Sequence, residues 1–245
     1  MKKNNIMKRA TLSADIVASS SLSTRELDHL TQRIYNLFEK IQNYQDDNNK
    51  GKLKMRLTAG DLVECFLFDP NDALRVALAL KAGIKSFPLD DFFNHDPTTE
   101  KYRKLFEMYG IRIAIGIGDM DLELADKNIL KGEAITLSGR LISEQKTSNK
   151  ERVTIKNTLF FRSESEYQNR IFQPIFSLLD TIFTKMTRKQ SEIVLWKLVG
   201  YSEQDIAHEF GVSQSSVNQH SKNAGWTSIE EAVFLFSIFD FQHDK

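Results

Sequence analysis

The sequence predicts an α+β fold followed by a smaller, wholly helical part. Three observations lead to this prediction. Apolar and polar residues alternate near residues 8–17, 53–68 and 111–117, and a period of two is typical of strands. Between these stretches, apolar residues recur at the spacing of one helix face. After a polar segment at residues 163–168, the pattern is helical to the end of the chain.

Composition places the chain among globular proteins. It has 245 residues, enough for one large domain or two small ones. Hydrophobic residues make up 41% and charged residues 27%, which is ordinary for a soluble protein. No apolar run reaches the roughly 20 residues that cross a bilayer, and the basic N-terminus lacks a signal-peptide core. Cys65 is the one cysteine, so we expect a reduced, cytoplasmic protein with no membrane partner.

Residues 1–162 form the first predicted domain. Ser23 and Glu26 match a capping box and begin a long amphipathic helix. Gly60 and Asp61 stand at the turn of a hairpin. In order, we predict a strand at 8–17, a helix from 23 to about 44, the hairpin 53–68, a helix at 73–86, a short helix at 99–109, a strand at 111–117, a helix at 132–145 and a strand at 153–155.

This order is that of the ferredoxin-like arrangement, in which one antiparallel sheet carries helices on one face. The first strand is expected in the centre, beside the hairpin. Asp15, at the end of that strand, then lies next to Asp61 at the turn. Gly116 and Gly118 in the later strand mark places where a backbone or ligand can approach closely.

Residues 171–245 form the second predicted domain, after a linker at 163–170. Pro174 is tolerated in a first helical turn, so we expect a helix to begin near it. Thr187 with Gln190 forms a further capping box. The last helix is predicted at 232–241. It is apolar enough that we expect it to pack on a partner chain or on the helix that ends near residue 186.

Asp15 and Asp61 are the first candidate site. Asp61 is either a turn residue, because aspartate is common in turns, or a metal ligand. Two carboxylates on adjacent strands repel each other, and a divalent cation relieves the repulsion. Mg²⁺ typically takes one or two carboxylates together with substrate phosphates. The pair therefore supports the hypothesis of a metal site for phosphate chemistry.

Four motifs occur within residues 8–156, in this order: Ala14-Asp15-Ile16, Ala59-Gly60-Asp61, Ile111-Arg112-Ile113-Ala114-Ile115-Gly116 and Gly132-Glu133-Ala134-Ile135-Thr136-Leu137-Ser138-Gly139-Arg140-Leu141. In order and spacing they resemble the core motifs of the class III nucleotidyl cyclases. The resemblance implies that Asp15, Asp61 and the backbone carbonyl of Ile16 hold Mg²⁺ or Mn²⁺, and that a nucleotide is the ligand. It also implies a catalytic role for Arg140 at the transition-state phosphate.

Two positions depart from the cyclase pattern. Thr136 stands where cyclases carry an asparagine that orients the sugar, and Leu57 stands where they carry a lysine that reads the base. Losing both groups removes nucleotide selectivity, because a polar edge of the ligand would be left unpaired. Arg140 can equally be a salt-bridged surface residue. We therefore expect a degenerate cyclase-like domain.

The second candidate site is a helix–turn–helix in which Ser202 and Ser213 cap two helices and Gly211 makes the turn. The second helix, predicted at 214–223, matches a recognition helix, because Gln and Asn read adenine edges while Ser and Lys reach phosphates. The alternative is a helical bundle with a solvated polar face. The residues predicted to contact DNA are Gln214, Ser215, Ser216, Asn218, Gln219 and Lys222.

A cyclase-like domain followed by a helix–turn–helix that ends in Ala224-Gly225-Trp226 resembles the SatD family. That resemblance implies a bacterial DNA-binding transcriptional regulator. Our hypothesis makes the first domain a degenerate nucleotide- or metal-binding sensor and dimerisation unit. The formal net charge is zero, so a monomer has no overall basic field for DNA, and we expect a homodimer. The alternative is an enzyme, a metal-dependent nucleotidyl cyclase or other nucleotide-binding phosphoryl-transfer enzyme.

Overall fold

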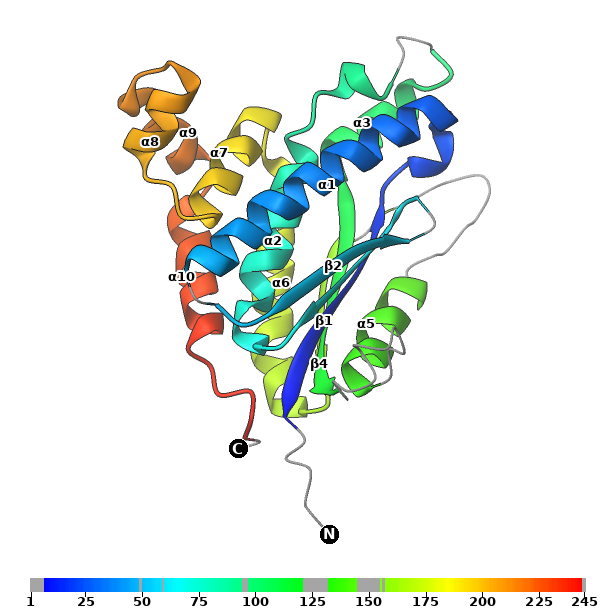
Figure 1. Cartoon of the computed structure of the whole chain (residues 1–245), viewed down its shortest axis with the longest axis vertical. Coiled ribbons are helices and arrows are strands. Elements are labelled where there is room, and N and C mark those ends of the chain that lie inside the picture. The colour runs from blue at the N-terminus through cyan, green and yellow to red at the C-terminus, as the bar shows by residue number, and fades with distance from the viewer. Residues whose placement is uncertain are drawn as a thin grey trace.

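The computed structural model describes residues 7–48, 50–58, 60–93, 97–120, 132–144, 155 and 157–243. It is an α+β structure in which one mixed sheet lies between helices (Figure 1). The strands are β1 (Lys8–Ile16), β2 (Leu53–Thr58), β3 (Leu62–Leu67), β4 (Ile111–Asp119) and β5 (Leu159–Ser163). The helices are α1 (Thr24–Asp47), α2 (Ala73–Lys85), α3 (Glu100–Tyr109), α5 (Glu133–Glu144), α6 (Glu166–Lys185), α7 (Arg188–Leu198), α8 (Glu203–Phe210), α9 (Gln214–Asn223) and α10 (Trp226–Ser237).

The strand order is β2-β3-β1-β4-β5, so β1 lies in the centre beside the hairpin, as the sequence predicts. Neighbouring strands are antiparallel except for β4 and β5, which are parallel. The prediction of a wholly antiparallel sheet was therefore wrong. The last strand is also not at 153–155, since β5 begins at Leu159; residues 153 and 154 lie outside the described part.

Helices cover both faces of the sheet, which corrects the prediction of a single covered face. Leu12 and Ala14 of β1 belong to the main hydrophobic core with α1 and α2. The alternate residues of β1 point the other way. There the Thr11 hydroxyl donates to the Ala134 carbonyl of α5, 2.7 Å away. A Cβ on Gly116 would lie 2.7 Å from the Ser138 nitrogen, so glycine is what lets α5 approach the sheet closely.

Helix α6 begins earlier than predicted. Ser165 caps it by accepting a hydrogen bond from the Gln168 backbone N–H, and Pro174 lies inside the helix rather than in its first turn. The segment 163–170, predicted as a linker, contains the end of β5 and the first turn of α6. Phe176 of α6 shares one hydrophobic cluster with Leu12 of β1. The division into domains 1–162 and 171–245 remains a prediction.

Helix α10 packs on α6, one of the two outcomes predicted for the last helix. The Phe236 ring centroid lies 4.9 Å from that of Phe172 and 6.2 Å from that of Phe176. The helix runs from Trp226 to Ser237, earlier than predicted. Within the described ranges, no helix combines the length and apolar character that a membrane crossing needs.

A buried charged cluster ties α6 to α2 and β5. Lys81 of α2 is fully buried, and its ammonium donates to the Thr158 hydroxyl at 2.6 Å and the Ile111 carbonyl at 3.1 Å. Asp180 of α6 lies 3.7 Å from that ammonium and accepts from the Thr158 backbone N–H at 2.7 Å. Burial lowers the pKa of Lys81 to about 8. The cluster joins the helical part of the chain to the sheet.

Candidate functional site

The hairpin tip and the end of β1 lie side by side. Gly60 adopts φ of +81°, a conformation that favours glycine, and starts the turn into β3. The backbone N–H of Ile16 donates to the carbonyl of Asp61 over 3.1 Å, and Asp15 pairs with Leu62 in the β1–β3 register. The structure therefore brings the two predicted carboxylate residues to the same end of the strands, where β1 ends and β3 begins.

Asp15 is buried and paired within the protein. It lies directly opposite Arg112 in the β1–β4 register. Arg112 donates from Nε to Oδ1 of Asp15 at 2.9 Å and from Nη2 to Oδ2. A bidentate arginine–carboxylate pair of this kind is both strong and directional. Each Asp15 oxygen thus accepts a hydrogen bond from the same guanidinium.

Asp61 is held by the segment that follows β1. The Ser19 hydroxyl donates to Oδ2 of Asp61 at 2.8 Å. Ala18, just before Ser19, has φ of +64°, in the left-handed region that non-glycine residues seldom occupy. Such strain persists only where surrounding contacts hold it. Ser19, directly after this turn, therefore links the segment that follows β1 to the hairpin tip.

These residues do not present an open pair of carboxylates to a metal ion. A cation at Asp15 would have to displace the Arg112 guanidinium from both oxygens. Among the described residues, no group of three or more His, Cys, Asp or Glu side chains is arranged to hold a metal. The arrangement therefore does not fit a divalent cation as it stands.

Helix α5 carries the other residues of the cyclase resemblance. Arg140 is exposed on it, and the Thr136 hydroxyl donates to the Gly132 carbonyl at 3.2 Å. Ser138, which sequence reasoning did not select, is fully buried and lies 2.9 Å from the hydroxyls of Thr11 and Ser13. The hydroxyl residues Thr11 and Ser13, two apart on one face of β1, were the sequence signal that this face meets a polar partner. Ser138 docks α5 on the sheet.

Helices α8 and α9 form the second predicted site. Ser202 and Asp205 make a capping box at the start of α8, and Ser213 caps α9. Gly211 has φ of +61°, so the chain reverses there as predicted. Behind the turn, α7, α8 and α9 enclose a small hydrophobic cluster made of Ile193, Ile206, Ala207 and Val217, with Trp196 and Phe210 at its edge.

The predicted contact residues of α9 differ in accessibility. Gln214, Ser215, Gln219 and Lys222 are exposed, and Ser216 and Asn218 are half-buried. Some of them also make internal hydrogen bonds. The Asn218 amide donates to Glu203 at 3.0 Å, the Gln219 amide donates to Asn223 at 3.0 Å, and the Ser215 hydroxyl lies 2.9 Å from that of Ser213.

Lys197 of α7, which sequence reasoning missed, holds the three helices together. Its ammonium donates to Glu203 of α8 at 2.7 Å and to Ser221 of α9 at 3.0 Å, and it lies 4.7 Å from the Trp226 ring centroid. The hydrogen bond from Lys197 lowers the pKa of Glu203. The orientation of α9 is therefore set by a polar network as well as by the apolar cluster.

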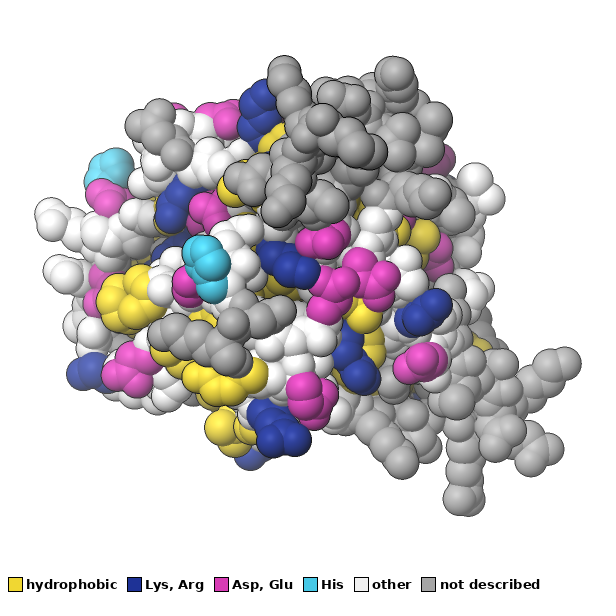
Figure 2. All heavy atoms as spheres, turned by 90° about the horizontal axis from the view of Figure 1, so that it is seen from below, with side chains coloured by type: hydrophobic (Ala, Val, Ile, Leu, Met, Phe, Trp, Pro, Cys, Tyr) yellow, Lys and Arg dark blue, Asp and Glu magenta, His cyan; other side chains and the backbone are white. Residues whose placement is uncertain are grey.

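The region carries no excess of positive charge. Residues 187–226 contain four Lys or Arg and four Asp or Glu, so their formal charges cancel. Two of these cations pair within the region, Lys189 with Glu192 and Lys197 with Glu203. At the end of the molecule where the termini lie, Figure 2 likewise shows acidic and basic side chains interspersed. A nucleic-acid contact in this region would therefore gain nothing from net positive charge in residues 187–226.

No known family model matches the chain, and no curated protein matches it either.

Proposed function

We propose that the protein is a DNA-binding transcriptional regulator, in which α8 and α9 form a helix–turn–helix and α9 enters the major groove. The observation that carries the proposal is the exposed polar face of α9, presented by a helix that the Gly211 turn and the Lys197 network hold in place. Glutamine side chains on such a helix can pair with adenine edges.

The sheet-containing part serves in this proposal as a degenerate cyclase-like sensor and dimerisation unit of a SatD-like protein. The strand order β2-β3-β1-β4, with antiparallel neighbours, supports a ferredoxin-like core. The Asp15–Arg112 pair supports the loss of the metal site. A homodimer in the bacterial cytoplasm would double the phosphate contacts that a neutral monomer lacks.

The test is selection of bound duplexes from a random DNA library, followed by mobility-shift titrations at several salt concentrations. Gln219→Ala should weaken binding about 5- to 100-fold and relax the selected sequence at one position. Lys222→Ala should weaken all duplexes alike and reduce the salt slope by about one. Gln173→Ala on α6 and Lys101→Ala on α3, both exposed, are the matched controls.

Failure to retain any duplex at low salt would refute the proposal. So would unchanged binding by both α9 variants. Sedimentation of the free and DNA-bound protein would report whether it binds as a homodimer.

A second candidate is a Mg²⁺- or Mn²⁺-dependent nucleotidyl cyclase or related phosphoryl-transfer enzyme. It is favoured by the hydrogen bond from the Ile16 backbone N–H to the Asp61 carbonyl, which brings the end of β1 to the hairpin turn. It requires that a metal and nucleotide displace Arg112 from Asp15, with Arg140 at the phosphate. Incubation with nucleoside triphosphates and either cation tests it. Product that disappears with Asp61→Asn would support the enzyme and demote the regulator.

A further inference from the structure

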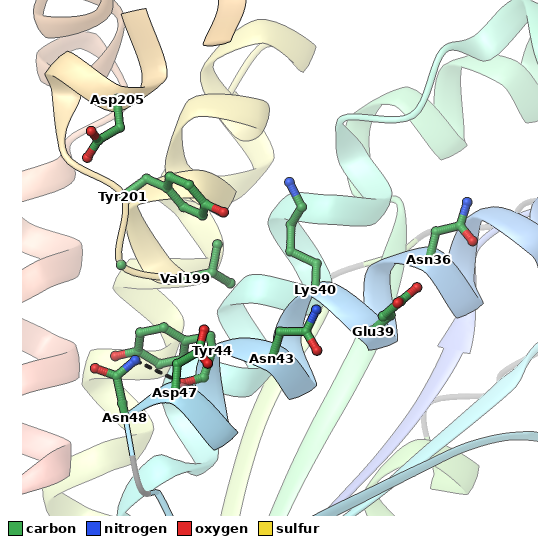
Figure 3. Close-up of a pocket in the computed structure, with 11 residues that line it drawn as sticks. Asn36, Glu39, Lys40, Asn43, Tyr44, Asp47, Asn48, Val199, Tyr201 and Asp205 are labelled. Atoms are coloured by element: carbon green, nitrogen blue, oxygen red, sulfur yellow. Dashed lines mark hydrogen bonds between the residues drawn. The ribbon is translucent and has the colours of Figure 1, made fainter. Parts of the chain in front are cut away.

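A cavity of about 580 Å³ lies between α1 and the segment that leads from α7 into α8 (Figure 3). Its volume is within the range of small-molecule sites in proteins. One wall is a polar face of α1 and the other is formed by Val199, Gly200, Tyr201 and Asp205. The cavity therefore touches both the sheet-packed helix α1 and the first turn of α8.

Two tyrosines line the cavity, Tyr44 of α1 and Tyr201 after α7. The Tyr44 ring lies against Gly200, where an added Cβ would be 3.0 Å from the ring. The Arg75 guanidinium lies 5.5 Å from the Tyr44 ring centroid. Gly200 has φ of +90°, so the chain turns there and carries Tyr201 to the opposite wall. Gly200 and Arg75 therefore already contact the Tyr44 ring, whereas Tyr201 is exposed and offers ring surface to a bound molecule.

The described walls carry more negative than positive charge. Glu39 and Asp47 of α1 and Asp205 of α8 supply carboxylates, while Lys40 is the only cation among the described lining residues. Glu39 and Asp47 are eight residues apart on one helix, which corresponds to a rise of about 12 Å. The negative charge is therefore spread along the cavity instead of being focused on one point.

An ammonium group already occupies the aromatic wall. Lys40 extends toward Tyr201 (Figure 3), and its Nζ lies 3.3 Å from the Trp196 ring centroid and 6.0 Å from that of Tyr201. Burial lowers the pKa of Lys40. Aromatic faces attract ammonium groups in this geometry. Trp196 is not a lining residue, so the Lys40 contact shows that aromatic rings beside the cavity accept an ammonium group.

We propose that the cavity binds a small aliphatic polyamine. Its ammonium groups would pair with Glu39, Asp47 and Oδ1 of Asp205, since Oδ2 of Asp205 already accepts from the Ser202 hydroxyl and backbone N–H. Its methylene chain would lie on the tyrosine rings. Several separated carboxylates fit an extended, multiply charged amine better than a compact cation. Asn36 and Asn43 add amide oxygens that accept from ammonium N–H groups.

Because Asp205 belongs to α8, ligand binding would change the contacts between α1 and the α8–α9 pair. This regulatory step rests on the proposed DNA binding. A ligand that contacts one arrangement of α8 more favourably shifts the population toward it, and the coupling to DNA is reciprocal. The ligand site itself does not depend on DNA.

The test is calorimetric titration of the full chain with spermidine at low ionic strength, without DNA. We expect saturable binding at one site. Asp47→Asn and Glu39→Gln should each weaken it about two- to fivefold, in line with exposed ion pairs. Lys40→Gln should tighten it by a similar factor, because a competing cation is removed. Glu166→Gln and Lys101→Gln, exposed elsewhere, should leave it unchanged.

No saturable heat with spermidine would overturn the proposal. Equal weakening by Glu166→Gln, or full competition by Mg²⁺ at matched charge, would also overturn it, since binding would then be counterion association only. The DNA assay is separate, so either proposal can fail alone. Spermidine also binds DNA, so coupling is measured as the difference between the wild-type chain and Asp47→Asn.

Discussion

The polar groups inside the molecule and those on α9 have different hydrogen-bond partners. Asp15 and Lys81 are buried, and each is paired with a charged group on a different element, Arg112 and Asp180. On α9, Gln214, Gln219 and Lys222 are exposed, and the Gln219 amide donates to Asn223 of the same helix. Interior charges therefore hold elements together, whereas the α9 groups remain accessible to a partner.

This contrast is testable because mutation should affect stability in the first set and binding in the second. Removing one member of a buried pair leaves an uncompensated charge, so folding stability should fall. Removing an exposed polar side chain should leave stability nearly unchanged and alter only binding.

Asp180→Ala should have the largest effect. It strips Lys81 and Thr158 of their acidic partner in the core, and we expect the free energy of unfolding to fall by about 3–5 kcal/mol. Urea denaturation followed by circular dichroism measures it. Glu166→Gln, exposed on the same helix, is the control and should change stability little. If Asp180→Ala lowers the free energy of unfolding by less than 1 kcal/mol, the buried cluster does not hold α6 to the sheet as inferred.

Two glycine variants should change stability in opposite directions. Gly116→Ala places a Cβ against the α5 backbone, and we expect a loss of about 1–3 kcal/mol. Gly139→Ala on α5 has nothing within 4 Å of the new Cβ, so it should gain about 0.5–1 kcal/mol from helix propensity. Thermal melts of both variants test the docking of α5. Equal shifts of the melting temperature in the two variants would refute the docking.

Lys85 of α2 is buried, and its ammonium donates to the Glu107 carbonyl at 2.9 Å and to that of Met108. Burial lowers its pKa to about 7, against about 10.4 for an unfolded lysine. Between these values the unfolded chain binds more protons, so stability from this group rises with pH. Below pH 7 Lys85 is protonated in the folded chain too, so the folded state bears the full free-energy cost of a buried ammonium.

Compared with Lys85→Met, the wild-type chain should therefore gain about 1–3 kcal/mol as pH rises from 7 to 10. Denaturant midpoints of both proteins at three pH values provide the measurement. Parallel pH profiles would show that Lys85 does not titrate differently in the folded state.

The smallest effect is expected on α9. Gln214→Ala and Gln219→Ala should each change the free energy of unfolding by less than about 0.5 kcal/mol, while Gln219→Ala weakens DNA binding. The same denaturation assay tests this on the proteins used for the mobility shifts. A loss above 1 kcal/mol from either variant would mean that α9 uses these side chains for packing, and the contrast with the interior would disappear.

Local features were predictable from the sequence because neighbouring residues produce them. The capping boxes at Ser23 and Thr187 depend on side chains three residues apart, and both are confirmed. The turns at Gly60 and Gly211 depend on glycine's freedom at positive φ, and both are confirmed. The alternation in β1 and β4 predicted the strands, since it reports which face is buried.

Strand β5 and the start of α6 were missed because both depend on contacts made far along the chain. Strand β5 has only five residues, and an apolar pattern of that length does not distinguish a buried strand from a helix. Its pairing with β4 and its packing against α6 make this segment a strand. Pro174 forfeits one helical hydrogen bond, but Phe172 and Phe176 bury their rings on either side of it, which stabilises the uninterrupted helix.

By itself, the sequence determined the order of the elements, the central β1 beside the hairpin and the polar face of α9. Only the tertiary structure decided that the Asp15 carboxylate, at the end of β1, is paired with an arginine. Asp15 and Arg112 are 97 residues apart and meet only through the β1–β4 register. Charge pairing depends on distance in space, which a linear pattern of residues does not contain.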